Sequence, residues 1–340
     1  MSNVLTKKLF AKKPGAFDPP FGPGHERPNV YQKGMALTMK SCVMALGMFD
    51  GVHLGHLRVL SAAADIAEQL HIPLYVLTFR DHPRTALGTP TKLICSTEEK
   101  IARLKAAGAD EVIALPFASV RDLSPEGFIY YAIGQYGARF FVCGADYRFG
   151  KNGAGDVKTL EKLCAECGKG MKSVAFATDE TGEKISSRAI REKIEQGDCE
   201  GVRATLGRYF SIESSTVHGK GLAHQWGTPT INQVLPDDML LPKYGVYATL
   251  ATVAGKCYPA VTNVGIRPTF ADGNTPTVET YLLDGRFSEI QNVCVEFVRF
   301  LRSERPFADA EALQKQIHAD AETADALLRP MLDGSQSTRL

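Results

Sequence analysis

Residues 47–60 read GMFDGVHLGHLRVL, and this stretch decides how the first part of the chain folds. The apolar run CVMAL at residues 42–46 precedes it and has the composition of a short buried strand. Apolar residues then return at three- and four-residue spacing through residues 54–70, which is typical of a helix. Three glycines in the stretch leave the backbone free to turn and to approach a ligand closely. The stretch is therefore predicted to turn a strand into a helix.

Strand and helix signals keep alternating from this point to about Thr178. Further strands are expected in PLYVLTF, EVIALPF, RFFVCG and KSVAFA, and helices in STEEKIARLKAAG, SPEGFIYYAIGQYG and VKTLEKLCAECG. Repeated strand–helix units with apolar strands predict an α/β fold whose parallel sheet is covered on both faces. Ligands of such sheets bind beyond the carboxyl ends of the strands, which is where residues 47–53 would lie.

Two histidines, His53 and His56, stand where the first helix begins, and their spacing aims both imidazoles the same way. A helix N-terminus presents free N–H groups and a positive dipole end, which favour phosphate. Imidazoles there can donate hydrogen bonds to charge that develops on a phosphoryl group. The alternatives are two histidines that only fill a turn, or a zinc site, although no cysteine or third histidine lies at useful spacing. With Asp50 at the same junction, a phosphate site is the preferred interpretation.

The pattern changes after Tyr209. Residues 186–210 indicate a helical connector, and strand-like runs follow without helices between them: FSIESSTV, GVYATLATV, KCYPAVTNVG, TVETYLL and NVCVEFVRFL. Such strands predict an antiparallel sheet that closes into a small β-barrel. A polar helix, ADAEALQKQIHADAETADALL, is expected near the C-terminus to pack on this barrel.

Composition limits the classes of function. The chain has 340 residues, which suggests about two domains, and its formal net charge is +1, which favours neither nucleic acid nor an anionic membrane as a partner. No apolar run approaches the roughly 18 residues that span a bilayer, and no N-terminal segment resembles a signal peptide. The eight cysteines are interpreted as reduced thiols of a cytoplasmic protein. Cys164 and Cys167 form a CxxC, but helix-face cysteines are favoured over zinc ligands because no second ligand pair accompanies them.

Residues 1–38 are rich in proline and glycine and show no apolar period. They are expected to be a disordered extension, or to reflect a start codon placed upstream of Met39. The expected domains are residues 39–200 and 201–331, with a tail at residues 332–340.

Several motifs together resemble one family. GMFDGVHLGH is similar to the G-x-FDG-x-H-x-GH signature of bacterial bifunctional riboflavin kinase/FAD synthetases, although the HxGH core alone is shared with other nucleotidyltransferases and class I aminoacyl-tRNA synthetases. VCGADYRFGKNGAGD, KISSRAIREKIEQGD and LGRYF resemble further segments in the family's order, with Arg188 where threonine is usual. The resemblance covers the chain from Met39 to about Leu328. No GxxxxGK[ST] pattern is present, so the expectation of ATP binding depends on these loops.

The resemblance implies an N-terminal Rossmann-like nucleotidyltransferase domain that adenylylates FMN with ATP, releasing pyrophosphate. His53 and His56 would be catalytic and would stabilise the transition state, and Ser187 and Arg191 would hold the leaving phosphates. Asp146 and Arg148 are candidates for flavin binding. The full set of candidates for nucleotide and phosphate binding in this module is Gly47, Phe49, Asp50, Gly51, Ser186, Ser187 and Arg191. For Asp50, a turn or cap residue is an almost equal alternative, and for Arg148 a surface salt bridge.

The barrel would be a riboflavin kinase domain. HGKGLAHQWGTPTINQ resembles the family's ATP loop, and TVETYLLD supplies Glu279 as candidate general base for the ribityl 5′-hydroxyl. Thr230 and Asn232 would bind ATP phosphates and Mg²⁺, and Gly219 and Gly221 would bind phosphate. The loop departs from the family's usual residues at Ala223, His224 and Thr228, and Tyr281 replaces a histidine. Loss of an arginine there removes a fixed bidentate donor.

Three functions are therefore weighed. The first is an enzyme that makes FMN and then FAD, with ATP, Mg²⁺ and flavins as ligands, acting as a monomer or weak oligomer. The second is a monofunctional FAD synthetase whose barrel binds flavin without efficient catalysis. The third is a flavin-sensing protein without catalysis, which the retained His53, His56 and Glu279 argue against.

Overall fold

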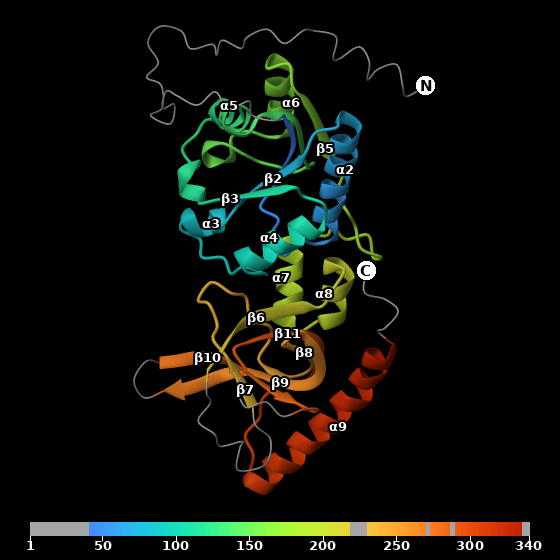
Figure 1. The fold of residues 1–340 in the computed structure, drawn as a ribbon. Helices are drawn as coiled ribbons and strands as arrows, with labels where there is room; N and C mark the ends of the chain where they lie inside the picture. Colours follow the sequence, from blue (N-terminus) through green and yellow to red (C-terminus); the bar gives the residue numbers. More distant parts are fainter. Residues whose placement is uncertain (1–40, 218–229, 270–272, 286–289, 335–340) are drawn as a thin grey trace. The chain divides into compact units, whose positions relative to one another are not determined.

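The computed structural model describes residues 41–217, 230–269, 273–285 and 290–334 (Figure 1). The expected extension at residues 1–38 lies outside these ranges. So do five positions discussed above for the kinase loop, namely Gly219, Gly221, Ala223, His224 and Thr228.

A five-stranded parallel sheet forms the first part of the described chain, as predicted. Its strand order is β3-β2-β1-β4-β5, and every neighbouring pair runs parallel. The strands are β1 (Cys42–Leu46), β2 (Leu74–Phe79), β3 (Glu111–Leu115), β4 (Ala138–Gly144) and β5 (Gly170–Val174). All five residues of the central strand β1 are buried, so the turn that follows β1 starts from a rigid base.

Helices cover both faces of this sheet. The covering helices are α2 (Leu54–Leu70), α4 (Thr97–Ala106), α5 (Pro125–Tyr136) and α6 (Val157–Glu166). The connecting segments hold the short helix α3 (Pro83–Ala86), which buries no residue, and the 3-10 turns η1 (Phe117–Ser119) and η2 (Lys151–Gly153). Val43 and Ala45 of β1 join the apolar cluster that holds Leu60 and Leu104, from α2 and α4. Met44 and Leu46 join the opposite cluster, which holds residues of α5 and α6. This alternation is what a doubly covered parallel strand requires.

The CxxC pair lies at the end of α6. Cys164 is buried in the apolar cluster between α5, α6 and the sheet, and Cys167 is the C-cap residue of α6. Among the described residues, no group of three or more His, Cys, Asp or Glu side chains could hold a metal ion.

Two helices, α7 (Ser187–Gln196) and α8 (Cys199–Leu206), connect the sheet to a closed six-stranded barrel. The barrel order is β10-β7-β6-β11-β8-β9, and its pairs are antiparallel. Its strands are β6 (Phe210–Val217), β7 (Thr230–Gln233), β8 (Gly245–Val253), β9 (Lys256–Thr269), β10 (Gly273–Leu282) and β11 (Asn292–Arg302). The sequence pattern predicted five of these six strands. It missed β7, whose four residues are too few to show a period.

The last helix, α9 (Ala310–Gly334), packs on the outside of the barrel. Ala324 and Leu328 are fully buried against Ala248 and Leu250 of β8. Arg302 of β11 also donates hydrogen bonds from Nε and Nη2 to the Asp320 carboxylate of α9, at 2.8 to 3.1 Å. The predicted C-terminal helix is therefore confirmed, and it continues six residues beyond its expected end at Leu328.

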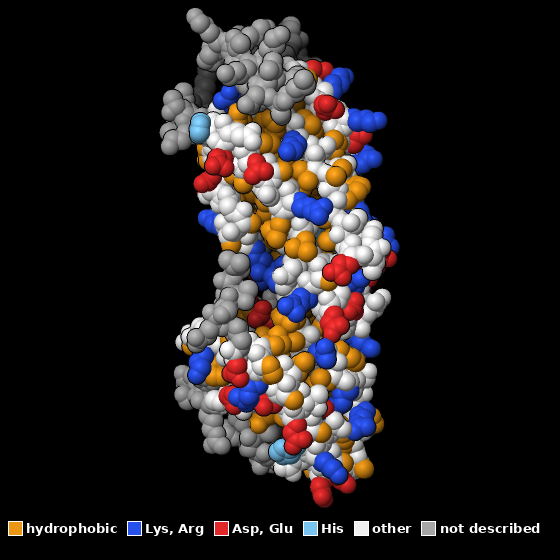
Figure 2. All heavy atoms as spheres, turned by 90° about the vertical axis from the view of Figure 1, so that its right-hand side faces the viewer, with side chains coloured by type: hydrophobic (Ala, Val, Ile, Leu, Met, Phe, Trp, Pro, Cys, Tyr) orange, Lys and Arg blue, Asp and Glu red, His pale blue; other side chains and the backbone are white. Residues whose placement is uncertain are grey.

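Figure 2 shows one face of the molecule, on which basic and acidic side chains alternate without gathering by sign. That pattern agrees with the near-neutral composition. In the part of the chain that the structure describes, every helix is too short or too polar to span a bilayer.

Candidate active sites

The turn between β1 and α2 has an uncommon backbone. Phe49, Gly51 and Val52 have φ angles of 51°, 79° and 41°. Positive φ is costly for a side chain, above all for a β-branched one, so the surroundings must hold this conformation. Phe49 and Val52 are almost fully buried, which supplies that hold. Gly47 is needed because a Cβ there would lie 2.9 Å from the Phe49 ring.

His53 and His56 cap the N-terminus of α2 for each other. The His56 N–H donates to Nδ1 of His53 at 3.2 Å, and the His53 N–H donates to Nδ1 of His56 at 3.4 Å. Their rings stack with centroids 3.5 Å apart. The predicted common direction of the two imidazoles is thus present in the structure, and the capping pair fixes it.

The histidines are held in one chemical form. Burial lowers the pKa of His53 to about 4, and burial, followed by the neighbouring His53, lowers the pKa of His56 well below its ordinary value. Both rings are therefore neutral near pH 7. Because each Nδ1 accepts a backbone N–H, the ring proton of each lies on Nε2. The pair offers two neutral N–H donors, which suit negative charge that develops on a phosphoryl group.

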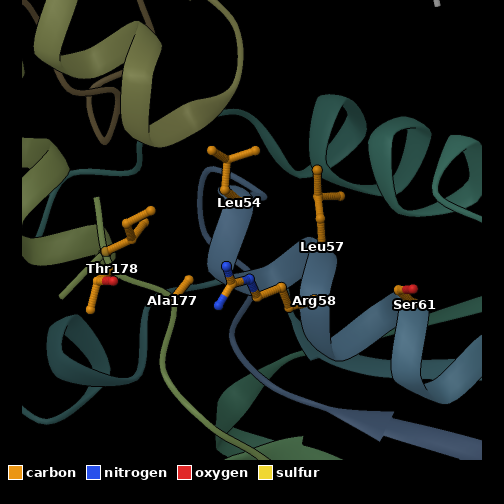
Figure 3. A pocket seen from close by; sticks show the side chains of 7 residues that line it. Leu54, Leu57, Arg58, Ser61, Ala177 and Thr178 are labelled. Carbon is orange, nitrogen blue, oxygen red and sulfur yellow. The ribbon is translucent and has the colours of Figure 1, made fainter. Parts of the chain in front are cut away.

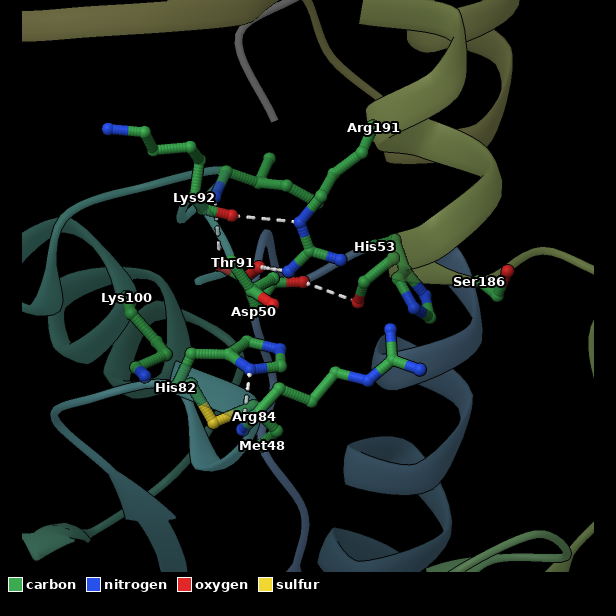
Figure 4. A network of polar contacts seen from close by, with 12 residues as sticks. Met48, Asp50, His53, His82, Arg84, Thr91, Lys92, Lys100, Ser186 and Arg191 are labelled. Atoms are coloured by element: carbon green, nitrogen blue, oxygen red, sulfur yellow. Dashed lines mark hydrogen bonds and ion pairs between the residues drawn. The ribbon is translucent and has the colours of Figure 1, made fainter. Parts of the chain in front are cut away.

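A buried ion pair joins this turn to α7 (Figure 4). Arg191 of α7 contacts the Asp50 carboxylate, and its Nε donates to the Lys92 carbonyl at 2.8 Å. The Ser187 hydroxyl donates to the Asp50 carbonyl at 2.9 Å, and Ser186 caps α7 by accepting from the Ala189 N–H. The structure thus brings the two predicted phosphate-binding segments, 47–56 and 186–191, side by side.

Asp50 is only 1% exposed, and both of its carboxylate oxygens have partners. One accepts from the Ile94 N–H at 3.0 Å, and the other contacts Arg191. Burial raises the pKa of Asp50, while Arg191 and the Ile94 N–H oppose that rise. The nucleotide or flavin contact expected of Asp50 stays a prediction, and the structure shows this carboxylate engaged in holding Arg191.

Lys100 and His82 lie in the same network, and neither is among the predicted site residues (Figure 4). Lys100 is 1% exposed and donates to the Phe79 carbonyl at 2.5 Å. Burial lowers its pKa, and Asp50 opposes the shift. Burial, then Arg191, lowers the pKa of His82 to about 4. A signal for Lys100 was available, since it precedes buried Leu104 by one helical turn and so belongs to the buried face of α4.

A pocket of about 370 Å³ opens along the first turns of α2 (Figure 3). It is lined by Leu54, Leu57, Arg58, Ser61, Ala177, Thr178 and Ile185. Leu54 directly follows His53, and Ile185 directly precedes Ser186. The pocket is mainly apolar apart from Arg58, Ser61 and Thr178, and it is continuous in sequence with both phosphate-binding candidates.

The two flavin candidates differ in their surroundings. Asp146 forms an ion pair of 2.6 Å with Lys184, and its charge acts on the pKa of His53. Its partner Lys184 directly precedes Ile185 of the pocket lining, so Asp146 lies near that side of the pocket. Arg148 is exposed and makes a 3.5 Å contact with the Gly153 carbonyl.

In the barrel, strand register brings the kinase candidates together. Glu279 of β10 lies opposite Asn232 of β7, and Tyr281 lies opposite Thr230. Directly opposed residues share a face of the sheet. Their neighbours Ile231 and Thr280 are buried and point into the barrel, so Thr230, Asn232 and Glu279 belong to its outer face. The Asn232 amide donates to the Thr230 carbonyl at 3.4 Å.

A row of buried hydroxyls supports this region from inside. Thr280 shares a hydrogen bond of 2.9 Å with Thr262, which shares one of 2.8 Å with Thr249. These bonds satisfy three polar groups in the apolar interior and link β10, β9 and β8. Register on the outer face is thereby fixed beneath Glu279.

Comparison with known proteins shows to which family the chain belongs. A model described as FAD synthetase matches residues 36–189, and one described as riboflavin kinase matches residues 206–328. The chain belongs to the bifunctional riboflavin kinase/FMN adenylyltransferase family. A family member from Bacillus subtilis is 36% identical over 290 residues, which is 83% of this chain and 91% of that protein. One from Escherichia coli K12 is 32% identical over 292 residues, or 84% and 92%.

A solved structure agrees with the fold. A crystal structure named as a macrolide-efflux protein from Streptococcus pneumoniae superposes with a TM-score of 0.76 and 29% identity. It covers 84% of this chain and 94% of that one. The match confirms the combination of parallel sheet, barrel and final helix for this family member, while the efflux name is said only of the pneumococcal protein. The expected domain bounds, residues 39–200 and 201–331, stay a prediction.

Proposed function

We propose that this family member carries its two activities at the two sites described above. The site at the start of α2 performs the FMN adenylyltransferase reaction, and the outer face of the barrel performs the riboflavin kinase reaction. The observation that carries the first assignment is the stacked, neutral histidine pair beside the Arg191 segment. The second rests on the register that sets Glu279 opposite Asn232.

In the adenylyl transfer, a phosphate oxygen of FMN attacks the α-phosphorus of ATP. The new P–O bond forms as the bond from the α-phosphorus to the bridging oxygen breaks, and pyrophosphate leaves. Phosphoryl chemistry needs positioning and charge stabilisation more than a covalent group. His53 and His56 would donate hydrogen bonds from Nε2–H to the equatorial oxygens while keeping their protons, and Arg191 with the N-terminus of α7 would stabilise the charge on the departing pyrophosphate.

The pocket in Figure 3 is suited to the adenosine of ATP. Its apolar walls, Leu54 and Ile185, can contact a base, and Arg58 and Ser61 supply polar groups at its edge. Because Leu54 is covalently next to His53, a base held there would bring the attached phosphates toward the histidines. Asp146 and Arg148 remain the proposed flavin contacts of this module.

In the kinase reaction, Glu279 takes the proton of the ribityl 5′-hydroxyl as that oxygen attacks the γ-phosphorus, and ADP leaves. Thr230 and Asn232 would bind the phosphates of ATP, together with Gly219 and Gly221. Mg²⁺ fits this face, since a hydroxyl, an amide and a carboxylate are the hard oxygen donors that the ion prefers alongside substrate phosphates. Thr230 and Asn232 would hold the ion, which neutralises phosphate charge when it is bound.

The proposal is tested with the full chain, riboflavin and Mg-ATP, followed by chromatography of the flavins. FMN is expected first and FAD later, with one pyrophosphate released for each FAD. FAD formation from supplied FMN, but no turnover of riboflavin, would remove the kinase half and support the monofunctional alternative. Absence of FAD from supplied FMN would overturn the assignment of the histidine site.

A further inference from the structure

Arg208 lies between α8 and β6, in a segment that the sequence marked only as a linker. Its side chain reaches the turn between β1 and α2. Nη2 donates to the Gly51 carbonyl at 2.8 Å, and Nη1 donates to the Val52 carbonyl at 3.4 Å. One guanidinium thus contacts two consecutive peptide units of the strained turn, where φ is positive at both residues.

This contact is costly to maintain. The Arg208 side chain is 20% exposed, and its Nε is buried without a hydrogen-bond partner among the described residues. Its acidic neighbour, Glu99, lies 4.0 Å away and also contacts Arg103 and Ser211. Burial lowers the pKa of Arg208 to about 10. A largely buried cation with one unsatisfied N–H lowers the free energy of unfolding. Its other contacts therefore call for a functional explanation.

Two planar peptide units connect the hydrogen bonds of Arg208 to the histidine pair. In the peptide unit between Val52 and His53, the carbonyl accepts a hydrogen bond from Arg208 and the N–H donates one to Nδ1 of His56. In the preceding peptide unit, between Gly51 and Val52, the carbonyl also accepts a hydrogen bond from Arg208. Its N–H donates to the Phe49 carbonyl at 3.1 Å. Since a peptide unit rotates as one body, holding the carbonyls also holds the N–H that His56 accepts.

The backbone beside Arg208 is fitted to the same turn. A Cβ on Gly207 would lie 2.7 Å from a methyl carbon of Leu54, the first residue of α2. Gly207 also has a φ of 76°, which glycine tolerates and other residues rarely adopt. The linker is therefore placed closely against the start of α2, and Arg208 extends that fit to the turn.

We propose that Arg208 is a positioning residue for adenylyl transfer, which holds the peptide units on both sides of Val52 and thereby fixes His56 with Nδ1 as acceptor and Nε2 as donor. This inference rests on the proposed function of the histidine pair. It gives the linker a role in the first reaction, although the linker leads into the barrel. Arg208 itself need not touch either substrate.

The test compares Arg208→Met and Arg208→Lys in the full chain with Arg203→Gln as a matched control. Arg203 is an exposed arginine of α8 that lies over the Tyr209 ring. For both Arg208 variants, kcat of FMN conversion to FAD is expected to fall by roughly 10²-fold, the size of effect that small misplacements produce. KM for ATP and the kinase rate should stay close to wild type, and Arg203→Gln should change neither reaction.

A spectroscopic reading separates positioning from stability. With ¹⁵N-labelled histidine, wild-type His56 should show a bare Nδ1 and a protonated Nε2, and Arg208→Met should show a mixture of tautomers. The pKa of His53 should also rise in that variant, because the Arg208 charge helps to lower it. Arg208→Lys keeps the positive charge but replaces the planar guanidinium with one ammonium group. This variant therefore serves for the test if Arg208→Met does not fold.

Wild-type kcat in a folded Arg208 variant would overturn the inference. So would a loss of kcat with an unchanged His56 tautomer, because Arg208 would then act through stability alone. Failure of the wild-type chain to make FAD would instead overturn the proposed function.

Discussion

The two sites are built in opposite ways. The proposed site at α2 is a largely buried arrangement in which Asp50 and Arg191 hold each other, and His53 and His56 hold each other, through hydrogen bonds. The proposed kinase site is a row of side chains on the outer face of the barrel sheet, where strand register sets Glu279 opposite Asn232. The first arrangement holds two neutral N–H donors in place, and the second places a carboxylate and an amide side by side on one face of a sheet. Adenylyl transfer needs charge stabilisation, whereas the kinase step needs a base, so the difference matches the chemistry.

The largest expected effect concerns the barrel. Glu279→Gln removes the proposed base and should lower the rate of FMN formation from riboflavin by about 10²–10⁴-fold, the range that general-base catalysis contributes. Conversion of supplied FMN to FAD should continue, as followed by chromatography. The matched control is Glu311→Gln, an exposed carboxylate of α9. Retained kinase activity in Glu279→Gln would show that Glu279 is not the general base.

The second effect concerns the histidine pair. His56→Ala removes one N–H donor and the partner that caps His53, and FAD formation should fall by about 10²–10³-fold. Formation of FMN should be spared. His318→Ala, which changes an exposed histidine of α9, should leave both rates unchanged. Loss of both reactions in His56→Ala would mean that the two sites are coupled or that the variant misfolds, and thermal unfolding distinguishes these outcomes.

Sequence patterns predicted much of this comparison. The parallel sheet followed from alternating strand and helix signals, and the pairing of His53 with His56 followed from their spacing of three residues. The residues ISSRAIR indicate the second candidate phosphate-binding segment, but only the fold could show Arg191 beside Asp50, since 141 positions separate them. Periodicity gives the face of an element, and it does not tell which distant side chain meets that face.

The same limit explains what the sequence missed. Arg208 stands in a short linker without any period, so nothing local indicates that its guanidinium reaches Gly51. Strand β7 has four residues, and it is held between β6 and β10, strands that are distant from it in the sequence. Asp50 resembled a turn residue because its burial depends on the chain around Ile94.

A third prediction contrasts a buried ion pair with an exposed one. Asp50→Asn keeps the shape but leaves Arg191 without its carboxylate, and the free energy of unfolding should fall by about 3–5 kcal/mol, as for other broken buried pairs. Glu192→Gln breaks the exposed pair between Arg188 and Glu192 and should cost about 0–1 kcal/mol. Urea unfolding of both variants measures the difference. Equal losses would show that the Asp50 network is not the rigid part of the site.

The smallest effect is a flat pH profile. Because burial lowers the pKa of His53 to about 4, the neutral donor persists well below the ordinary histidine pKa of 6.5. kcat for FAD formation should therefore show no titration near pH 6.5. Stability behaves differently: between pH 6.5 and 4 the unfolded chain binds a proton that folded His53 does not, so the free energy of unfolding falls as pH drops through this window. A change of kcat with an apparent pKa near 6.5 would contradict the conclusion that both histidines are neutral.

We infer from the separate sites proposed above that they act independently and that free FMN passes from the barrel to the histidine site. Mixing His56→Ala with Glu279→Gln, and supplying only riboflavin and Mg-ATP, tests it directly. Each variant alone should make almost no FAD, while the mixture should make FAD, because FMN released by the intact barrel of the first reaches the intact histidine site of the second. No FAD from the mixture, although each variant keeps its remaining activity, would contradict the account.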